Sequence, residues 1–124
     1  MRARLDEIVF DCADPAALAR FWASLLEAEA VDREPHWSYV DPPGLPRLAF
    51  QRVPEPKAVK NRLHLDLMAG DIPAATAEAV AAGAGAAGEL VTDAYGQFQV
   101  LRDPEGNEFC FVSGRAARGG RTRA

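Results

Sequence analysis

The sequence predicts an α+β domain built from two copies of one β-α-β-β-β module. Three observations predict this class. The 124 residues suffice for one core, a strand followed by an aspartate-capped helix occurs twice, and similar strand endings recur at a nearly constant offset. One module alone would leave one face of its sheet bare. We therefore expect the two modules to pair into a curved, mostly antiparallel sheet around a cavity, with both helices outside.

The first module begins with a strand over residues 5–12, which are rich in β-formers. Asp14 and Pro15 then provide an N-cap and a proline at the first helical position. The apolar stripe of the predicted helix consists of Leu18, Phe21, Trp22, Leu25 and Leu26. Residues 36–40 and 49–53 predict antiparallel strands that complete the module.

The second module repeats this order. Residues 63–68 alternate between apolar and polar side chains, so Leu63, Leu65 and Leu67 are expected to pack beneath the second helix. Asp71 caps that helix, which is predicted to run from residue 72 to 82. An offset of 57 residues places His64 on Glu7 and Asp71 on Asp14.

Three further strands of the second module are predicted at residues 88–92, 96–101 and 108–112, and a tight turn at 103–107. The glycine- and alanine-rich run at 82–88 is expected to be a flexible connection.

The predicted domain spans residues 1–113, with module one at about 5–53 and module two at about 62–113. Residues 114–124 are expected to form a disordered basic tail. The net charge of −4 includes the four tail arginines, so the remaining chain is strongly acidic. This balance argues against nucleic acid as a partner. No apolar run reaches the length of a membrane span, and the charged start does not resemble a secretory signal, so we expect a cytoplasmic protein without a membrane partner.

In the first and last strands of each module, alternation turns polar or thiol side chains toward the face opposite the helices, Asp66 and Glu108 among them. One from each of these four strands is singled out: Glu7, Gln51, His64 and Cys110. They are the candidate lining of the predicted cavity.

Three segments, taken in order around the repeat, resemble the glyoxalase-like members of the vicinal oxygen chelate superfamily, which also includes bleomycin-resistance proteins and dioxygenases. They are residues 5–9 with Phe21-Trp22, residues 62–67, and residues 103–109. The resemblance covers nearly all of residues 5–112. It implies a divalent metal, such as zinc, nickel, manganese or iron, held at the positions of Glu7, Gln51, His64 and Cys110.

The sequence departs from that family pattern at two positions. Glu7 stands where metal-binding relatives commonly have histidine or glutamine, and Cys110 where they commonly have glutamate. A thiolate ligand would favour zinc. The alternative is a site without metal, in which His64 is hydrogen-bonded to Glu7 or Asp66 and Cys110 is a buried thiol.

Two functions follow from the resemblance. The first is metal-assisted lyase or isomerase chemistry on a small molecule, related to lactoylglutathione lyase, with Glu7 or Glu108 moving a proton. The second is metal-free binding of a small molecule, as in bleomycin resistance. The candidate ligand-binding residues are Trp37, Tyr39, Asp66, Met68 and Phe98. The resemblance also implies a homodimer.

Overall fold

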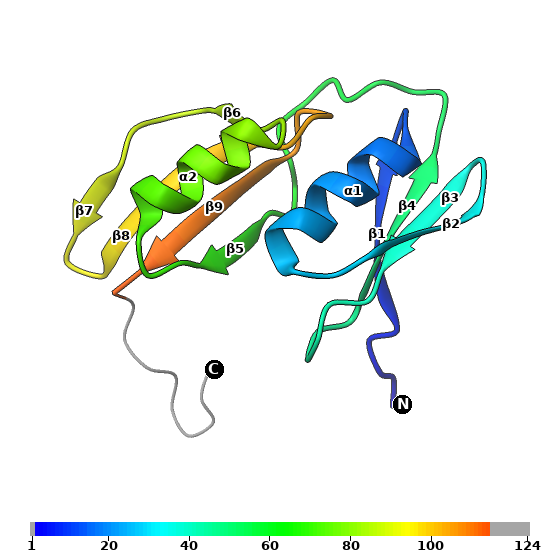
Figure 1. Cartoon of the computed structure of the whole chain (residues 1–124), viewed down its shortest axis with the longest axis horizontal. Helices are drawn as coiled ribbons and strands as arrows, with labels where there is room; N and C mark the ends of the chain where they lie inside the picture. The colour runs from blue at the N-terminus through cyan, green and yellow to red at the C-terminus, as the bar shows by residue number, and fades with distance from the viewer. Residues whose placement is uncertain (1, 115–124) are drawn as a thin grey trace. The chain divides into compact units, whose positions relative to one another are not determined.

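A computed structural model describes residues 2–114 of the chain. The chain forms two units, Met1–Val59 and Lys60–Ala124, and each contains one helix and one mixed sheet (Figure 1). The predicted α+β class is confirmed. The predicted tail lies outside the described residues, except for Gly114. No helix within residues 2–114 is long and apolar enough to cross a membrane.

The first unit contains one helix packed on a four-stranded sheet whose strand order is β1-β4-β3-β2. Its elements are β1 (Glu7–Cys12), α1 (Pro15–Leu26), β2 (Ala30–Glu34), β3 (Trp37–Val40) and β4 (Arg47–Arg52). β1 and β4 are parallel, and the other neighbours are antiparallel. β2 is the one strand here for which the sequence predicted no residue range, because it is a charged, mostly exposed edge strand.

Helix α1 begins and packs as its sequence predicts. The Asp14 carboxylate accepts a hydrogen bond from the Ala17 N–H at 3.1 Å, and Pro15 occupies the first helical position. The Trp22 ring is buried and lies 5.4 Å from the Phe10 ring, whose other neighbour is Phe50 at 5.1 Å. This aromatic group joins α1 to β1 and β4 and forms the core of the unit.

The second unit has a five-stranded sheet in which β5, β9, β8 and β6 are consecutive neighbours and β7 also pairs with β8. Its elements are β5 (Leu65–Met68), α2 (Ile72–Ala81), β6 (Gly85–Ala86), β7 (Val91–Asp93), β8 (Gly96–Arg102) and β9 (Glu108–Ser113). Asp71 caps α2 as predicted, by accepting from the Ala74 N–H.

Three expectations for the second unit are corrected. The run at 82–88 is not only a connection, because β6 pairs there with β8. The strand expected at 88–92 is shorter and begins at Val91. β5 begins at Leu65, so Leu63 lies before the strand and is 67% exposed instead of packing beneath α2. Alternation cannot show where a strand starts, because it continues into the preceding loop.

The turn between β8 and β9 depends on one buried carboxylate. Asp103 is 3% exposed, and its Oδ1 accepts from the N–H groups of Glu105 and Asn107, both at 2.9 Å. The Asn107 side-chain amide also donates to Asp103. The carboxylate therefore satisfies donors that water reaches poorly.

Replacing Asp103 by alanine is expected to lower the free energy of unfolding by about 1–3 kcal/mol, because partly buried N–H groups would lose their acceptor. Urea denaturation followed by circular dichroism measures this loss. Asp103→Asn keeps one oxygen acceptor and is the matched control, with a smaller expected loss. A loss below about 0.5 kcal/mol for Asp103→Ala, typical of neutral surface changes, would contradict this account.

An ion pair fastens β2 to α1. The Arg20 guanidinium donates two hydrogen bonds to the Asp32 carboxylate, at 2.8 and 3.1 Å, and the buried Ser38 hydroxyl donates a third. The hydrogen bonds from Arg20, followed by that from Ser38, lower the pKa of Asp32 below its ordinary value of 3.8. A carboxylate with a lowered pKa in the folded state stabilises the fold above its ordinary pKa, and this stabilisation is lost as the pH falls through the folded-state pKa.

Asp32→Asn is therefore expected to destabilise the protein at pH 7, and the difference from wild type should shrink as the pH approaches about 2. Thermal melts across this range measure it. Asp6→Asn, an exposed change of the same kind, is the control. An Asp32→Asn difference that is the same at both ends of the range would refute the assignment.

Candidate metal centre

Two adjacent strands of the second unit place a carboxylate beside a thiol. Asp66 of β5 and Cys110 of β9 are direct partners in a parallel ladder, so their side chains project from the same face of the sheet. The neighbouring Phe109 and Phe111 alternate with Cys110 and are buried on the opposite face. Gln99, the partner of Phe111 on β8, lies on that same face and contacts Thr76 of α2, so α2 covers the face with the phenylalanines. Asp66 and Cys110 thus lie on the face away from α2, as the sequence predicted.

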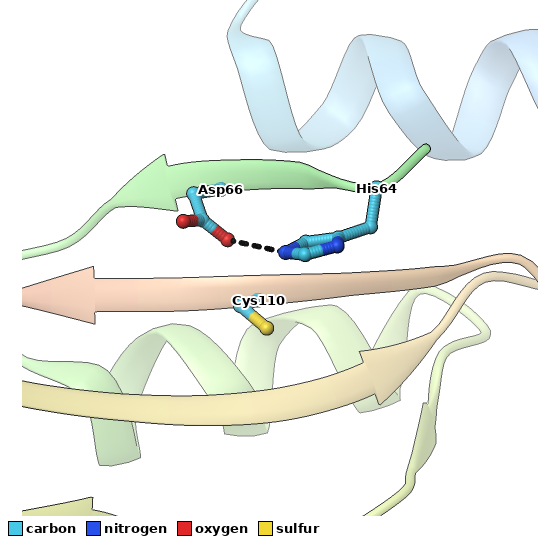
Figure 2. A group of neighbouring side chains, drawn as sticks. All are labelled: His64, Asp66 and Cys110. Carbon is cyan, nitrogen blue, oxygen red and sulfur yellow. Dashed lines mark ion pairs between the residues drawn. The ribbon is translucent and has the colours of Figure 1, made fainter. Parts of the chain in front are cut away.

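His64 completes the group from a different kind of position. It precedes the first residue of β5, and its Nε2 atom lies 3.2 Å from Asp66 Oδ1, an ion pair when the imidazole is protonated. One ligand atom from each of His64, Asp66 and Cys110 lies within 4.8 Å of the other two. Figure 2 shows the imidazole facing the carboxylate along β5, with the thiol beside them on β9.

The group is accessible to an ion from solvent. The side chains of His64 and Asp66 are 56% and 46% exposed, and Cys110 is half-buried. An ion pair with this exposure contributes little to stability. The convergence of the three side chains is therefore not explained by a contribution of the pair to folding.

The three donors fit zinc better than the other metals considered. Imidazole nitrogen, thiolate sulfur and carboxylate oxygen are the three ligand types of zinc, at bond lengths of about 2.0–2.3 Å. Tetrahedral geometry at those lengths puts ligand atoms roughly 3–4 Å apart. The 3.2 Å between His64 Nε2 and Asp66 Oδ1 lies in this range, and all three ligand atoms lie within 4.8 Å of one another. Three protein ligands leave one position open, which is the pattern of catalytic zinc sites.

The structure does not bring Glu7 and Gln51 together. In the parallel β1–β4 ladder Glu7 is opposite Arg47, whereas Gln51 is opposite Asp11 and donates to its carboxylate at 3.2 Å. Four residue positions separate the two levels, about 13 Å along the strands. Within the first unit, one ion cannot be reached by both side chains. Of the four predicted ligands, His64 and Cys110 are found together, and the third donor is Asp66, predicted only to contact ligand.

Glu108, a predicted proton carrier, begins β9 two residues before Cys110 on the same face. Its carboxylate forms an ion pair with Lys60 and lies 3.8 Å from the Arg102 guanidinium. The Glu108 side chain is 19% exposed. Proton transfer by Glu108 would therefore require at least one of these cations to move away.

Two of the predicted ligand-binding residues, Met68 and Phe98, are apolar and lie near the donor group, two residues further along the strands. Met68 of β5 is opposite Val112 of β9, which is opposite Phe98 of β8. These residues form an apolar row adjacent to the Asp66–Cys110 level, and Met68 is 85% exposed. Met68 and the half-buried Phe98 can contact an apolar part of a molecule bound at the donors, whereas Val112 between them is 6% exposed.

Trp37 and Tyr39 lie on β3 in the first unit, where they alternate with the buried Ser38 and Val40. Guanidinium groups stack on both rings: Arg33 lies 4.6 Å from the Trp37 ring centre, and Arg47 lies 3.7 Å from that of Tyr39. Hydrogen bonding to Asp41 raises the pKa of Arg47 above its ordinary value. Sequence reasoning identified the rings but missed the arginines, because a cation several residues away gives no local signal.

The fold and the donor group define a class of small α+β proteins that carry a potential metal site on the sheet face away from the helix. A model of the glyoxalase-like domain family matches residues 7–112, so the chain belongs to this family. The predicted resemblance is therefore confirmed. No match is found among curated proteins.

Solved structures of the glyoxalase, bleomycin-resistance and dioxygenase superfamily share this fold. An enzyme of that superfamily from Burkholderia phytofirmans PsJN has a TM-score of 0.75 at 20% identity, covering 89% of this chain and 98% of its own. A glyoxalase-related enzyme from Fulvimarina pelagi has a TM-score of 0.72 at 18% identity, covering 90% and 88%. The bleomycin-binding protein of Streptomyces verticillus, solved with copper(II)-bleomycin, has a TM-score of 0.62 at 22% identity, covering 93% and 100%.

Proposed function

We propose that this chain is a zinc-dependent enzyme of the glyoxalase-like family that carries out lyase or isomerase chemistry on a small molecule. The convergence of one nitrogen, one oxygen and one sulfur donor at His64, Asp66 and Cys110 carries the proposal. Zinc bound there would polarise a substrate oxygen and stabilise negative charge on it.

Different residues of the chain would hold the metal, contact the substrate and transfer the proton. His64 and Asp66, already in contact, would need little rearrangement to hold an ion. Met68 and Phe98 supply apolar surface next to the donors, which favours a substrate with an apolar group close to its metal-binding oxygens. Glu108 is about 6–7 Å from Cys110 along β9, and we assign it the proton transfer, which requires release from Lys60 or Arg102. Glu7 stays a second candidate for this step, and homodimerisation stays a prediction.

Metal analysis of protein purified without chelator tests the metal site. We expect about one zinc per chain, and calorimetric titration of the metal-stripped protein is expected to show tighter binding of zinc than of manganese, because a thiolate ligand favours zinc. Glu7→Gln is the control, since Glu7 is not part of the donor group, and it should bind zinc as wild type does. Zinc binding that survives Asp66→Ala and Cys110→Ser unchanged would refute the proposed site.

A second function, metal-free binding of a small molecule, is favoured by the aromatic residues of the first unit. Tyr39 and Trp37 stack with arginines, and such stacked layers can accept a further planar group. The fold is shared with a bleomycin-binding protein. Thermal-shift measurements with bleomycin and with dicarbonyl compounds, each with and without zinc, discriminate the two. A shift with bleomycin that is independent of zinc would favour binding, whereas shifts that require zinc favour the enzyme.

A further inference from the structure

His64 is the one member of the donor group that the sheet does not hold. The β5–β9 ladder begins at Leu65, opposite Phe109, so the backbone of His64 lies in the loop before it. Asp66 and Cys110, by contrast, are fixed by their ladder. The Asp66 carboxylate contacts the imidazole, but an ion pair this exposed holds a side chain only weakly. A contact that fixes the backbone before His64 would therefore help the three donors to converge.

Asn61 makes that contact with both ends of its side-chain amide. Its Oδ1 accepts a hydrogen bond from the Glu108 N–H at 3.2 Å, and its Nδ2 donates to the Leu63 carbonyl at 3.2 Å. The Leu63 carbonyl belongs to the peptide unit that leads into His64. Glu108 is the first residue of the strand that carries Cys110. The amide of Asn61 therefore links the backbone before His64 to the strand of the thiol.

We propose that Asn61 is a positioning residue that holds His64 in ligand geometry beside Asp66 and Cys110. The inference rests on the proposed metal site and adds a residue that does not touch the metal. The neighbouring contact from Lys60 to Glu108 is a weaker candidate for this role, because the Lys60 side chain is 78% exposed and ion pairs at such exposure contribute little. Asn61 is itself half-buried, and both of its bonds are to backbone.

The two bonds have distinct consequences. Without the Glu108 N–H bond, the loop loses its attachment to β9. Without the Leu63 carbonyl bond, the peptide before His64 is free to rotate. Either change allows the imidazole more positions, and a metal site must then restrict them on binding, which weakens its affinity. Groups that orient a metal ligand typically contribute about 10- to 100-fold in affinity.

The experiment measures cobalt(II) binding, with cobalt as a spectroscopic substitute for zinc, by the thiolate charge-transfer absorption and by calorimetry. Asn61→Ala is expected to weaken binding about 10-fold while keeping the charge-transfer band at saturation, because Cys110 is still a ligand. Asn61→Asp keeps the acceptor for Glu108 but loses the donor to Leu63, and an intermediate affinity is expected. Leu63→Ala is the matched control: it is an exposed, neutral change in the same loop that keeps the carbonyl, and wild-type affinity is expected.

A double-mutant cycle with His64→Ala separates positioning from general destabilisation. In the His64→Ala background, adding Asn61→Ala should change affinity by no more than about twofold, because the imidazole that Asn61 positions is gone. The same 10-fold loss in both backgrounds, or wild-type affinity for Asn61→Ala, overturns the inference. Absence of cobalt and zinc binding by wild type overturns the proposed function instead, and the inference with it.

Discussion

Cys110→Ser is expected to weaken zinc binding by more than about 100-fold, because groups that only orient a ligand already contribute about 10- to 100-fold and Cys110 is a direct donor in the proposed site. A serine hydroxyl is a poor zinc ligand at neutral pH, whereas thiolate sulfur is among the preferred ones. Calorimetric titration with zinc and the loss of the cobalt charge-transfer band measure the effect.

The chain provides its own control in a second cysteine. Cys12 is 5% exposed and its thiol donates to the Gln51 carbonyl at 3.6 Å, on the first unit's sheet. Cys12→Ser is expected to leave zinc affinity unchanged, even if it costs some stability. Equal losses for the two cysteine variants would show that the effect on zinc arises through folding and not through ligation.

Trp22→Ala is expected to lower the free energy of unfolding by about 3–5 kcal/mol. The indole is 1% exposed and lies against Phe10 and Phe21, whose ring centres are 5.4 and 5.7 Å away. A loss of this size is a large part of the about 5–15 kcal/mol by which domains are stable. Urea denaturation followed by circular dichroism measures it.

Two variants calibrate that result. Trp22→Phe keeps an aromatic ring in the same place and should cost clearly less. Val31→Ala, on the exposed edge strand β2, should be nearly neutral. If Trp22→Ala costs no more than about 0.5 kcal/mol, the range usual for surface changes, the packing between α1 and its sheet does not determine the stability of this unit.

Local signals in the sequence were sufficient to predict most of the fold. Asp14 and Asp71 each precede a helix with proline in one of its first two positions, and both act as N-caps because short carboxylates satisfy the first N–H groups. β2 had no assigned range because its charged residues carry no apolar alternation. β6 was missed because a two-residue strand has no periodicity and depends on β8 for its hydrogen bonds.

The sequence predicted on which face of the sheet each candidate side chain lies, but not which residues are neighbours across the strands. Alternation placed Asp66 and Cys110 on the correct side of their sheet. It could not reveal that Glu7 is opposite Arg47 while Gln51 is opposite Asp11, because ladder register depends on how two distant segments align. The internal repeat showed that Glu7 and His64 occupy corresponding positions in the two modules. It does not show which residue of the neighbouring strand is paired with either of them. Asp66 was for the same reason predicted only to line the site.

The register of the second sheet fixes the distance between the metal-binding group and the apolar surface that a bound molecule would contact. The exposed Met68 lies two residues beyond Asp66 on β5, a spacing of about 6–7 Å that is set by the backbone itself. Side-chain substitutions can change the chemistry at either position but not the distance between the two positions along the strand. A ligand that uses both must carry its apolar group within a few bonds of its chelating oxygens, so chain length between these two parts is the property by which this surface would select among otherwise similar compounds.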